Sequence, residues 1–349
     1  MSNEKFKIVN IEKETDYEGW LNFRLRGVGA SEVGTLLGLN PYKSKIELFY
    51  QKLGFIPLKQ DENLAMFYGS RLEDFVANMW QYYDDSAESV IDNFNFDSKK
   101  RFCKAVPGYI LNADYPNLFF SPDRIITKSD TERIIYNGNL VTKNIHGVLE
   151  IKTISGFSSK QWEGGIPPSY IIQLTTYMIG LETSYGEIVL LEDGRKLTVL
   201  PVERNEAIVT EILSAVQDFT DRVEAARADI ENVHLYEPEP DGTQAFESFL
   251  NKRYADSEMK TLQGTPELLE LAINHKKAQE EIKTQETIAR EYSNQIKNYM
   301  KEHEALDFGT KGKILWKTDA RGTRALRNNV IYGEWTYPWS NSGFGGSQS

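Results

Sequence analysis

A carboxylate and an amine stand two residues apart in the apolar run G-V-L-E-I-K-T at residues 147–153. If this run is an extended strand, Glu150 and Lys152 project from one face and Ile151 points into the core. A second carboxylate, Asp123, follows the apolar run at residues 118–120. Two hard oxygen ligands can hold Mg²⁺ or Mn²⁺, and the amine can activate or electrostatically stabilise a water nucleophile. These residues predict a metal-dependent hydrolytic site.

Two elements must pair to bring these carboxylates together. Asp123 and Glu150 are 27 positions apart, which is wider than a tight hairpin allows. Residues 128–146 are therefore expected to form an excursion, a small exposed hairpin, between the two strands. This insertion leaves the strand register open, although it does not change which residues carry the chemistry.

Strand-like and helix-like segments alternate around this pair. Turn signals such as Pro107-Gly108 separate the expected strands, and apolar residues at spacings of 3 and 4 mark the expected helices. Strands are expected at 90–96, 101–106, 109–112, 118–120, 124–127, 133–136, 147–152, 185–191 and 197–202, and helices at 45–54, 63–83, 167–181 and 204–231. Strands followed by covering helices predict an α/β (α+β) fold, a mixed sheet flanked by helices.

Two of these helices carry further polar candidates. Glu73 lies beside the apolar stripe of the helix at 63–83, where a carboxylate gains nothing from burial alone. Gln173 and Tyr177 are four apart and share one face of the helix at 167–181. A salt bridge at the rim is the alternative role for Glu73, and a buried amide with packing partners is the alternative for Gln173.

A glycine-rich segment near the beginning could contact a phosphate. It reads R-L-R-G-V-G-A-S-E over residues 24–32, and Ser31 is expected to cap a short helix that ends near Gly38. Backbone N–H groups and the positive end of the helix dipole at such an entry favour an anion. The alternative is a helix cap with small packing residues.

Five ordered motifs within residues 20–200 resemble the YqaJ-type viral recombinases, which are phage exonucleases similar to lambda exonuclease in the PD-(D/E)XK nuclease superfamily. The motifs are R-x-x-G-(V/I)-G-A-S-(D/E), L-G-L-N-P-Y-K-S, the helix segment G-S-R-L-E at 69–73, S-P-D at 121–123 and E-I-K-T at 150–153. The resemblance implies a restriction-endonuclease-like sheet. It implies metal ligation by Asp123, Glu150, the Ile151 carbonyl and Glu73, catalytic roles for Lys152 and Gln173, and phosphate contacts from Arg24, Ser31 and Tyr177.

The same resemblance implies an activity. The protein is expected to be an ATP-independent 5'→3' exonuclease on double-stranded DNA, using one or two Mg²⁺ or Mn²⁺ ions and releasing 5'-phosphorylated products. It would leave 3' single strands for a phage single-strand annealing protein, and its relatives form a ring-shaped homotrimer around DNA.

Two other functions remain open on the sequence. An endonuclease of the same superfamily would use identical metal chemistry, and only the enclosure of a DNA end distinguishes the exonuclease. A non-catalytic DNA-end or recombinase-loading module is the second alternative, because the E-x-K pattern also occurs in many exposed strands.

Composition is compatible with DNA as the substrate once the charge is located. The net charge is −11, but residues 203–258 hold fourteen acidic and five basic side chains, a net of −9, so the remainder is nearly neutral. Basic clusters elsewhere, for example at 99–104 and 311–327, could contact phosphates.

One cysteine, Cys103, excludes disulfide frameworks and fits a reducing cytoplasm, and we read it as a small buried hydrophobe. No signal peptide or membrane span is expected, so we predict a cytoplasmic protein of a phage or prophage in a bacterial host.

The remaining chain is expected to be an appendage to the nuclease domain. We predict an exonuclease domain at 1–235, a helical arm at 236–310 with a heptad-like seam from Leu268 to Leu306, and a basic strand with an aromatic, Gly/Ser-rich tail at 311–349. The seam contains two histidines, which predicts an intramolecular hairpin or a partner-docking arm better than a homodimeric zipper.

Overall fold

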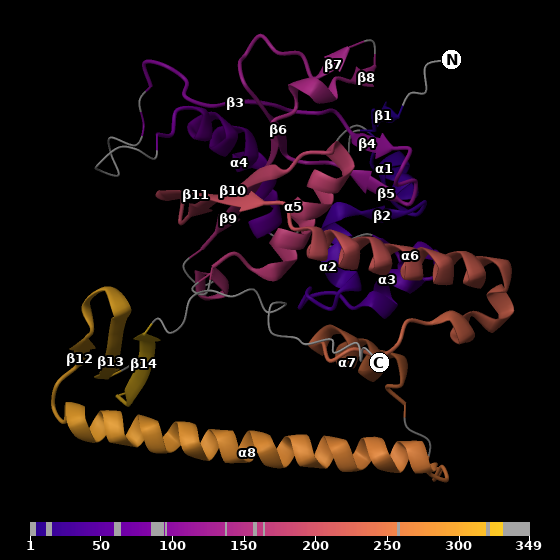
Figure 1. The fold of residues 1–349 in the computed structure, drawn as a ribbon. Coiled ribbons are helices and arrows are strands. Elements are labelled where there is room, and N and C mark those ends of the chain that lie inside the picture. Colours follow the sequence, from indigo (N-terminus) through magenta and orange to yellow (C-terminus); the bar gives the residue numbers. More distant parts are fainter. Residues whose placement is uncertain are drawn as a thin grey trace, which may run out of the picture. The chain divides into compact units, whose positions relative to one another are not determined.

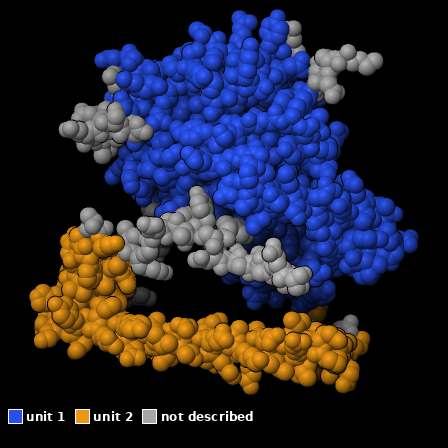
Figure 2. All heavy atoms as spheres, viewed as in Figure 1, with its two compact units in different colours: residues 1–255 blue, residues 256–349 orange. Residues whose placement is uncertain are grey.

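The computed structural model describes residues 5–11, 16–58, 64–84, 94, 96–136, 138–155, 159–162, 165–256, 259–318 and 322–330. The chain divides into two compact units, residues 1–255 and 256–349 (Figure 2). The division lies twenty residues beyond the predicted domain end at 235, because helix α7 (Gln244–Arg253) packs on α3 (Lys45–Lys52) of the first unit. Their contact includes the stacked rings of Tyr50 and Phe249.

A five-stranded sheet forms the centre of the first unit, with strand order β11-β10-β9-β6-β3 (Figure 1). Its strands are β3 (Phe102–Lys104), β6 (Arg124–Thr127), β9 (Gly147–Ile154), β10 (Tyr185–Glu192) and β11 (Lys196–Glu203). The β9–β10 pair is parallel and the other pairs are antiparallel. This mixed sheet with covering helices confirms the predicted fold class.

The two faces of β9 are covered by different helices because its side chains alternate. Val148 faces the core that includes helix α5 (Pro168–Leu181), whereas Leu149 and Ile151 face the core that includes Trp80 of helix α4 (Leu64–Gln81). Glu150 and Lys152 share the parity of Val148 and therefore lie on the α5 face. The alternation that was read from the sequence thus determines which helix meets the site.

A second sheet, with order β1-β4-β5-β2, packs against α5. It contains β1 (Phe6–Val9), β2 (Val28–Gly29), β4 (Tyr109–Asn112) and β5 (Leu118–Phe120). Gly180 permits the close approach, because a Cβ atom there would lie only 2.4 Å from the ring of Phe120. The excursion expected at 128–146 contains a small hairpin of β7 (Ile135–Tyr136) and β8 (Asn139–Leu140), as predicted.

Short helices precede the central sheet and a long one follows it. They are α1 (Tyr17–Arg24), α2 (Ala30–Leu36) and α3, and later α6 (Glu206–Ala228), with 3-10 turns at Thr142–Asn144, Ser159–Trp162, Ile230–Tyr236 and Gly309–Lys311. We expected Ser31 to cap α2, and it does not. Gly29 is the N-cap and has no side chain to accept from the first turn, and the Glu32 carboxylate accepts a hydrogen bond from the Gly29 N–H instead.

Helix α4 is only partly buried, contrary to the wide buried stripe that its sequence suggested. Val76 and Trp80 in its C-terminal half are buried, whereas Leu64, Phe67 and Tyr68 in its N-terminal half are exposed. Helix α4 packs on β3, β9 and β10, and the buried side chains all lie toward its C-terminal end. Of the strand expected at 90–96, only Phe94 and Phe96 lie within the described residues, and Phe94 forms an isolated bridge with Tyr83.

The second unit consists of a 35-residue helix and a small sheet. Helix α8 (Pro266–Met300) begins at an N-cap threonine, Thr265, and the antiparallel sheet contains β12 (Ala305–Asp307), β13 (Gly312–Thr318) and β14 (Arg324–Val330). The predicted helix therefore ends before Leu306, which lies in β12. The aromatic tail beyond residue 330 lies outside the described residues. Within the described ranges, no helix is both long and apolar enough to cross a membrane.

Candidate active site

Strand β9 presents Glu150 and Lys152 side by side, as the i, i+2 spacing predicted. The Lys152 Nζ atom donates a hydrogen bond to Glu150 Oε1 at 2.5 Å. Glu150 is buried, whereas the Lys152 side chain is 22% exposed and lies over the ring of Tyr170 from α5, 4.8 Å from its centroid. The amine is therefore held between a carboxylate and an aromatic face.

Asp123 reaches β9 because the pairing of β6 with β9 ends just before it. Arg124 pairs with Leu149, and Asp123 precedes this register by one residue. Its Oδ2 atom then accepts a hydrogen bond from the Ile151 backbone N–H at 2.7 Å. A carboxylate thus replaces the missing strand partner at this N–H, and Asp123 and Glu150 come together as predicted.

Helix α5 fixes the orientation of Glu150 through Gln173. The Gln173 Nε2 atom donates to Glu150 Oε1 at 2.7 Å and to the Tyr177 hydroxyl at 3.1 Å. The Tyr177 hydroxyl in turn donates to the Ser121 carbonyl oxygen at 3.0 Å. Because its hydroxyl is engaged on both sides, Tyr177 is part of the scaffold that holds Gln173, and its phosphate contact stays a prediction.

Glu73 lies near the other carboxylates but is bound to an arginine. Arg124 Nη1 contacts Glu73 Oε1 at 2.5 Å, and Arg124 Nη2 pairs with Asp74. Across the described part of the chain, no three His, Cys, Asp or Glu side chains form a group that could hold a metal ion. The predicted set of three acidic side chains is therefore not assembled in this arrangement, because Arg124, the neighbour of Asp123, neutralises Glu73.

These groups line one cavity of about 800 Å³. Its walls include Glu73, Asp123, Glu150, Ile151, Lys152, Thr153, Tyr170, Lys43 and Tyr42. The Glu150 Oε2 atom is buried and has no hydrogen-bond partner among the described residues. A buried carboxylate oxygen without a donor is costly unless a cation or donor completes it. Together with Asp123, this oxygen fits a hard divalent cation.

The electrostatics of the cavity show an excess of negative charge. Burial, and then the charge of Glu150, raise the pKa of Asp123 to about 7 against the opposing charge of Lys152. Burial also raises the pKa of Glu150. Burial acts to lower the pKa of Lys152, but the Glu150 and Asp123 charges outweigh it and raise this pKa to about 12. A further cation would relieve this excess.

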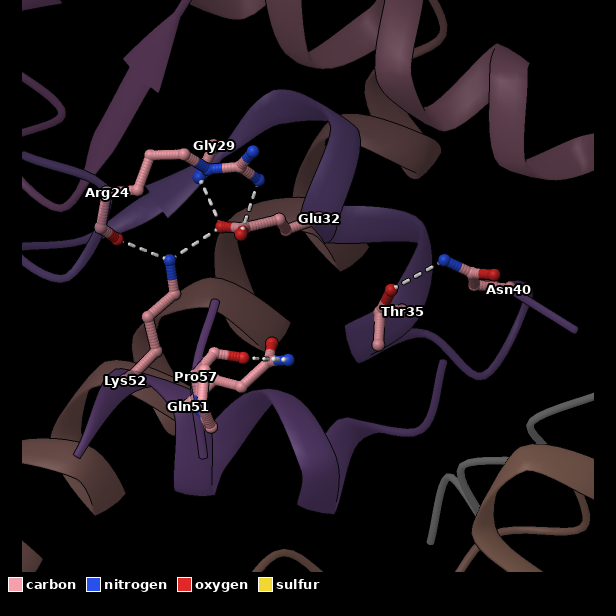
Figure 3. A network of polar contacts seen from close by, with 8 residues as sticks. All are labelled: Arg24, Gly29, Glu32, Thr35, Asn40, Gln51, Lys52 and Pro57. Carbon is pink, nitrogen blue, oxygen red and sulfur yellow. Dashed lines mark hydrogen bonds and ion pairs between the residues drawn. The ribbon is translucent and has the colours of Figure 1, made fainter. Parts of the chain in front are cut away.

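Arg24, a predicted phosphate contact, belongs to a separate network of buried charges (Figure 3). Its Nη2 atom contacts Glu32 Oε1 at 2.6 Å, and Lys52 Nζ contacts Glu32 Oε2 at 2.7 Å and the Arg24 carbonyl oxygen at 2.5 Å. The Arg24 guanidinium also lies over Trp20, 4.8 Å from the ring centroid. Ser31 is exposed on α2 beside this network, and neither Arg24 nor Ser31 is among the described residues that line the catalytic cavity.

Several residues of the site were not singled out from the sequence. Glu32 stands at the last position of the first motif, so the motif carried a signal for it, whereas nothing around Lys52 marked it as a buried cation. Lys43 is the lysine of the motif L-G-L-N-P-Y-K-S and was given no role, yet it lines the catalytic cavity. Burial lowers its pKa, and the nearby charge of Arg24 acts in the same direction.

Comparison with known proteins finds relatives of this chain. Residues 19–182 match the sequence model of the YqaJ-like viral recombinase domain. The chain is 28% identical over 309 residues to the uncharacterized protein YqaJ of Bacillus subtilis (strain 168), covering 87% of this chain and 84% of that protein.

The solved structures found by comparison share little sequence with the chain. An alkaline exonuclease (LHK-Exo) from Laribacter hongkongensis is 22% identical, with a TM-score of 0.44, over 61% of this chain and 96% of that one. A phage-related exonuclease from Haemophilus somnus 129PT is 13% identical, with a TM-score of 0.36, over 59% and 98% of the two chains. The matches to the domain model and to YqaJ cover the segments that build the cavity, from α1 through α5, so this part of the chain is similar to the YqaJ-like viral recombinase domain.

Proposed function

We propose that this protein is a metal-dependent, ATP-independent 5'→3' exonuclease that resects double-stranded DNA ends to 3' single-strand tails for recombination by strand annealing. The observation that carries the proposal is the buried, unpartnered Glu150 Oε2 atom, beside Asp123 and Lys152 on one cavity wall. The match of residues 19–182 to the YqaJ-like viral recombinase domain supports a DNA substrate.

Asp123, Glu150 and the Ile151 carbonyl would hold one or two Mg²⁺ or Mn²⁺ ions, and Glu73 would join them if Arg124 released it. The ion supplies charge neutralisation and an acidified water when bound. Glu150 Oε2 is the oxygen left open for it, while Gln173 keeps Glu150 Oε1 in place.

Lys152 then positions the nucleophile. Its ammonium, which donates to Glu150 in this structure, can donate a hydrogen bond to the attacking water. After losing a proton, the amine can instead accept a proton from that water. Water adds to phosphorus, the P–O3' bond breaks, and the leaving oxygen takes a proton. The products are a 5'-phosphate and a 3'-hydroxyl, and Arg24 and Ser31 would bind the phosphate of the resected strand.

This activity places the protein with DNA in the cytoplasm of a bacterial host. The proposal includes a phage single-strand annealing protein as partner and a ring-shaped trimer of this chain around the DNA. Light scattering behind size-exclusion chromatography would measure the oligomer, and a monomer at working concentration would contradict the ring.

The decisive experiment uses linear duplex DNA labelled separately at each 5' and 3' end. We expect release of the 5' label first, with Mg²⁺ and not with chelator. Prompt cutting of covalently closed duplex would instead indicate an endonuclease, and binding without any degradation would indicate a loading module.

Lys152→Ala separates chemistry from binding in the same assay. Removing a positioned proton-transfer group is expected to lower the rate on the order of a hundredfold or more, with duplex binding largely kept. Lys196→Ala, which removes an exposed lysine from β11 at the edge of the same sheet, is the matched control and is expected to be fully active. Unchanged activity in Lys152→Ala would remove the catalytic role of Lys152.

A further inference from the structure

A second cavity, of about 710 Å³, lies between α3 and α7. Its walls include Tyr50 from α3 and Tyr42 from the loop before α3. On the other side they include Phe249, Lys252 and Arg253 from α7. Helix α7 lies beyond residues 19–182, so this wall is outside the part of the chain that matches the domain model. We call it the α3–α7 cavity.

Flat aromatic surfaces dominate this cavity. The rings of Tyr50 and Phe249 stack, with centroids 6.0 Å apart and planes 20° from parallel. Tyr42 at the edge is 79% exposed, although aromatic side chains of this size normally bury most of their surface. An exposed ring beside a stacked pair is a surface on which a further planar group can stack.

Cationic groups accompany the rings. The Arg253 guanidinium lies 5.4 Å from the Tyr50 ring centroid and 5.9 Å from that of Phe249, and it pairs with Glu237 at 2.8 Å. Lys252 is exposed on the same helix. Glu47 is the one carboxylate among the described residues in the cavity wall, so the wall carries two cations and one anion. Aromatic faces interleaved with cations match the bases and phosphates of single-stranded nucleic acid.

The α3–α7 cavity and the catalytic cavity share one wall residue. Tyr42 lines both, and its hydroxyl accepts a hydrogen bond from Gln161 Nε2 at 3.2 Å. A DNA strand with its phosphate at Glu150 and Lys152 therefore has an adjoining cavity for neighbouring nucleotides.

We propose that the α3–α7 cavity binds unpaired bases of a single DNA strand adjacent to the catalytic cavity, with Tyr42, Tyr50 and Phe249 as the stacking surface and Lys252 on the backbone. The inference rests on the proposed function for its substrate class. It adds a place where strand ends separated from the duplex are held while the phosphodiester is cut.

The test measures binding without hydrolysis. The full-length protein in chelator is titrated with a fluorescein-labelled oligothymidylate of about 20 nucleotides, and anisotropy gives the affinity. Phe249→Ala is expected to weaken binding between about 5-fold and about 100-fold, the range for removing one stacking partner. Lys252→Ala is expected to reduce the slope of log affinity against log salt by about one.

Phe55→Ala is the matched control. Phe55 also contacts Tyr50, edge to face with centroids 5.8 Å apart, and is 54% exposed, but it is not among the described residues that line the cavity. Its affinity is expected to stay within about twofold of that of the parent chain. Phe249→Leu, which keeps an apolar side chain at the α3 contact but removes the ring, guards against misfolding and is expected to bind as weakly as Phe249→Ala.

A crosslinking measurement locates the strand. Oligonucleotides carrying 5-iodouracil are expected to crosslink to peptides containing Tyr42 or Phe249. Equal binding by Phe249→Ala and the parent chain, equal weakening by Phe55→Ala, or crosslinks only elsewhere would each overturn the proposal. If the parent chain degrades duplex ends but fails to bind the oligonucleotide, this inference falls alone. If it binds the oligonucleotide through Phe249 but never cuts DNA, the proposed nuclease falls and the cavity stands.

Discussion

Two groups of buried charges in the first unit have opposite electrostatics. At Glu32, burial acts to raise the carboxyl pKa, but Lys52 and Arg24 outweigh it and lower that pKa to about 2. At Asp123, burial and the charge of Glu150 together raise the pKa to about 7. Glu32 has two cationic partners of its own, whereas Asp123 shares Lys152 with Glu150.

This difference distinguishes a structural network from a candidate catalytic one. Glu32 accepts hydrogen bonds from Gly29 N–H, Lys52 and Arg24, so its oxygens are satisfied by the chain itself. Glu150 keeps one oxygen without a partner among the described residues. A buried charge that the fold leaves incomplete costs stability, and proteins retain such groups where function needs them.

The largest expected effect is on catalysis at the incomplete group. Asp123→Asn keeps an acceptor for the Ile151 N–H but removes the charge that would hold a cation. Several kcal/mol of metal-derived stabilisation would be lost, on the order of a thousandfold in rate. In chelator the free energy of unfolding of the same variant should be higher by on the order of 1 kcal/mol, because the substitution relieves repulsion with Glu150. Retained nuclease activity, or a less stable metal-free variant, would contradict the assignment of Asp123 to an incomplete, cation-binding group.

The structural group should respond in the opposite way. Glu32→Gln leaves Lys52 and Arg24 buried beside each other without their counter-charge. We expect a loss of about 3 to 5 kcal/mol in the free energy of unfolding, measured by denaturant titration. Glu206→Gln, which breaks an ion pair whose carboxylate side chain is 74% exposed, is the control and should cost about 1 kcal/mol or less. Equal losses in both variants would show that the Glu32 network is not special.

The two groups should also give opposite pH dependences of stability. The pKa of Glu32 is about 2 in the native state and 4.5 in the unfolded state. The unfolded state therefore binds more protons between these values, and stability rises as pH rises from 2 to 4.5. The pKa of Asp123 is about 7 in the native state and 3.8 in the unfolded state. The native state therefore binds more protons between these values, and stability falls as pH rises from 3.8 to 7.

Denaturant titrations in chelator from pH 2.5 to 8 would measure both limbs. Asp123→Asn should flatten the falling limb and leave the rising one. Added Mg²⁺ should also flatten the falling limb, because a bound cation favours the ionised carboxylate. A falling limb that survives in Asp123→Asn would assign it to other groups.

The smallest effect is expected at the residue that orients the incomplete group. Gln173→Ala removes the donor to Glu150 Oε1 and should cost about tenfold in activity or metal affinity, as loss of an outer hydrogen-bond partner does. Thr175→Val on the same helix is the control, because the buried Thr175 hydroxyl has no partner among the described residues. Its activity should not change, and an equal loss in both variants would point to helix packing instead.

Local pattern predicted much of the site because strand and helix periodicities are short-range. The i, i+2 spacing of Glu150 and Lys152 and the i, i+4 spacing of Gln173 and Tyr177 placed these pairs on common faces, and both pairs make hydrogen bonds. The apolar alternation along β9 assigned Ile151 to the opposite core.

Long-range contacts were beyond that reach. The stripe on α4 was apolar along its whole length, yet only residues of its C-terminal half are buried against the sheet. Arg124 was read as the start of a strand, but its guanidinium binds Glu73 and Asp74, which are about fifty residues earlier. The hydrogen bond from the Tyr177 hydroxyl to the Ser121 carbonyl oxygen, across 56 positions, also had no sequence signal.

The amino-acid sequence alone determined the chemical types at the site, the faces that present them and the family motifs that order them. Only the tertiary structure decided which charges are neutralised, since Lys52 reaches Glu32 across 20 positions and Arg124 reaches Glu73 across 51. A carboxylate's pKa depends on burial and on charges within a few ångströms. Both are set by chain segments that meet only on folding, and that is why a structural carboxylate and a candidate metal ligand look alike until the chain is folded.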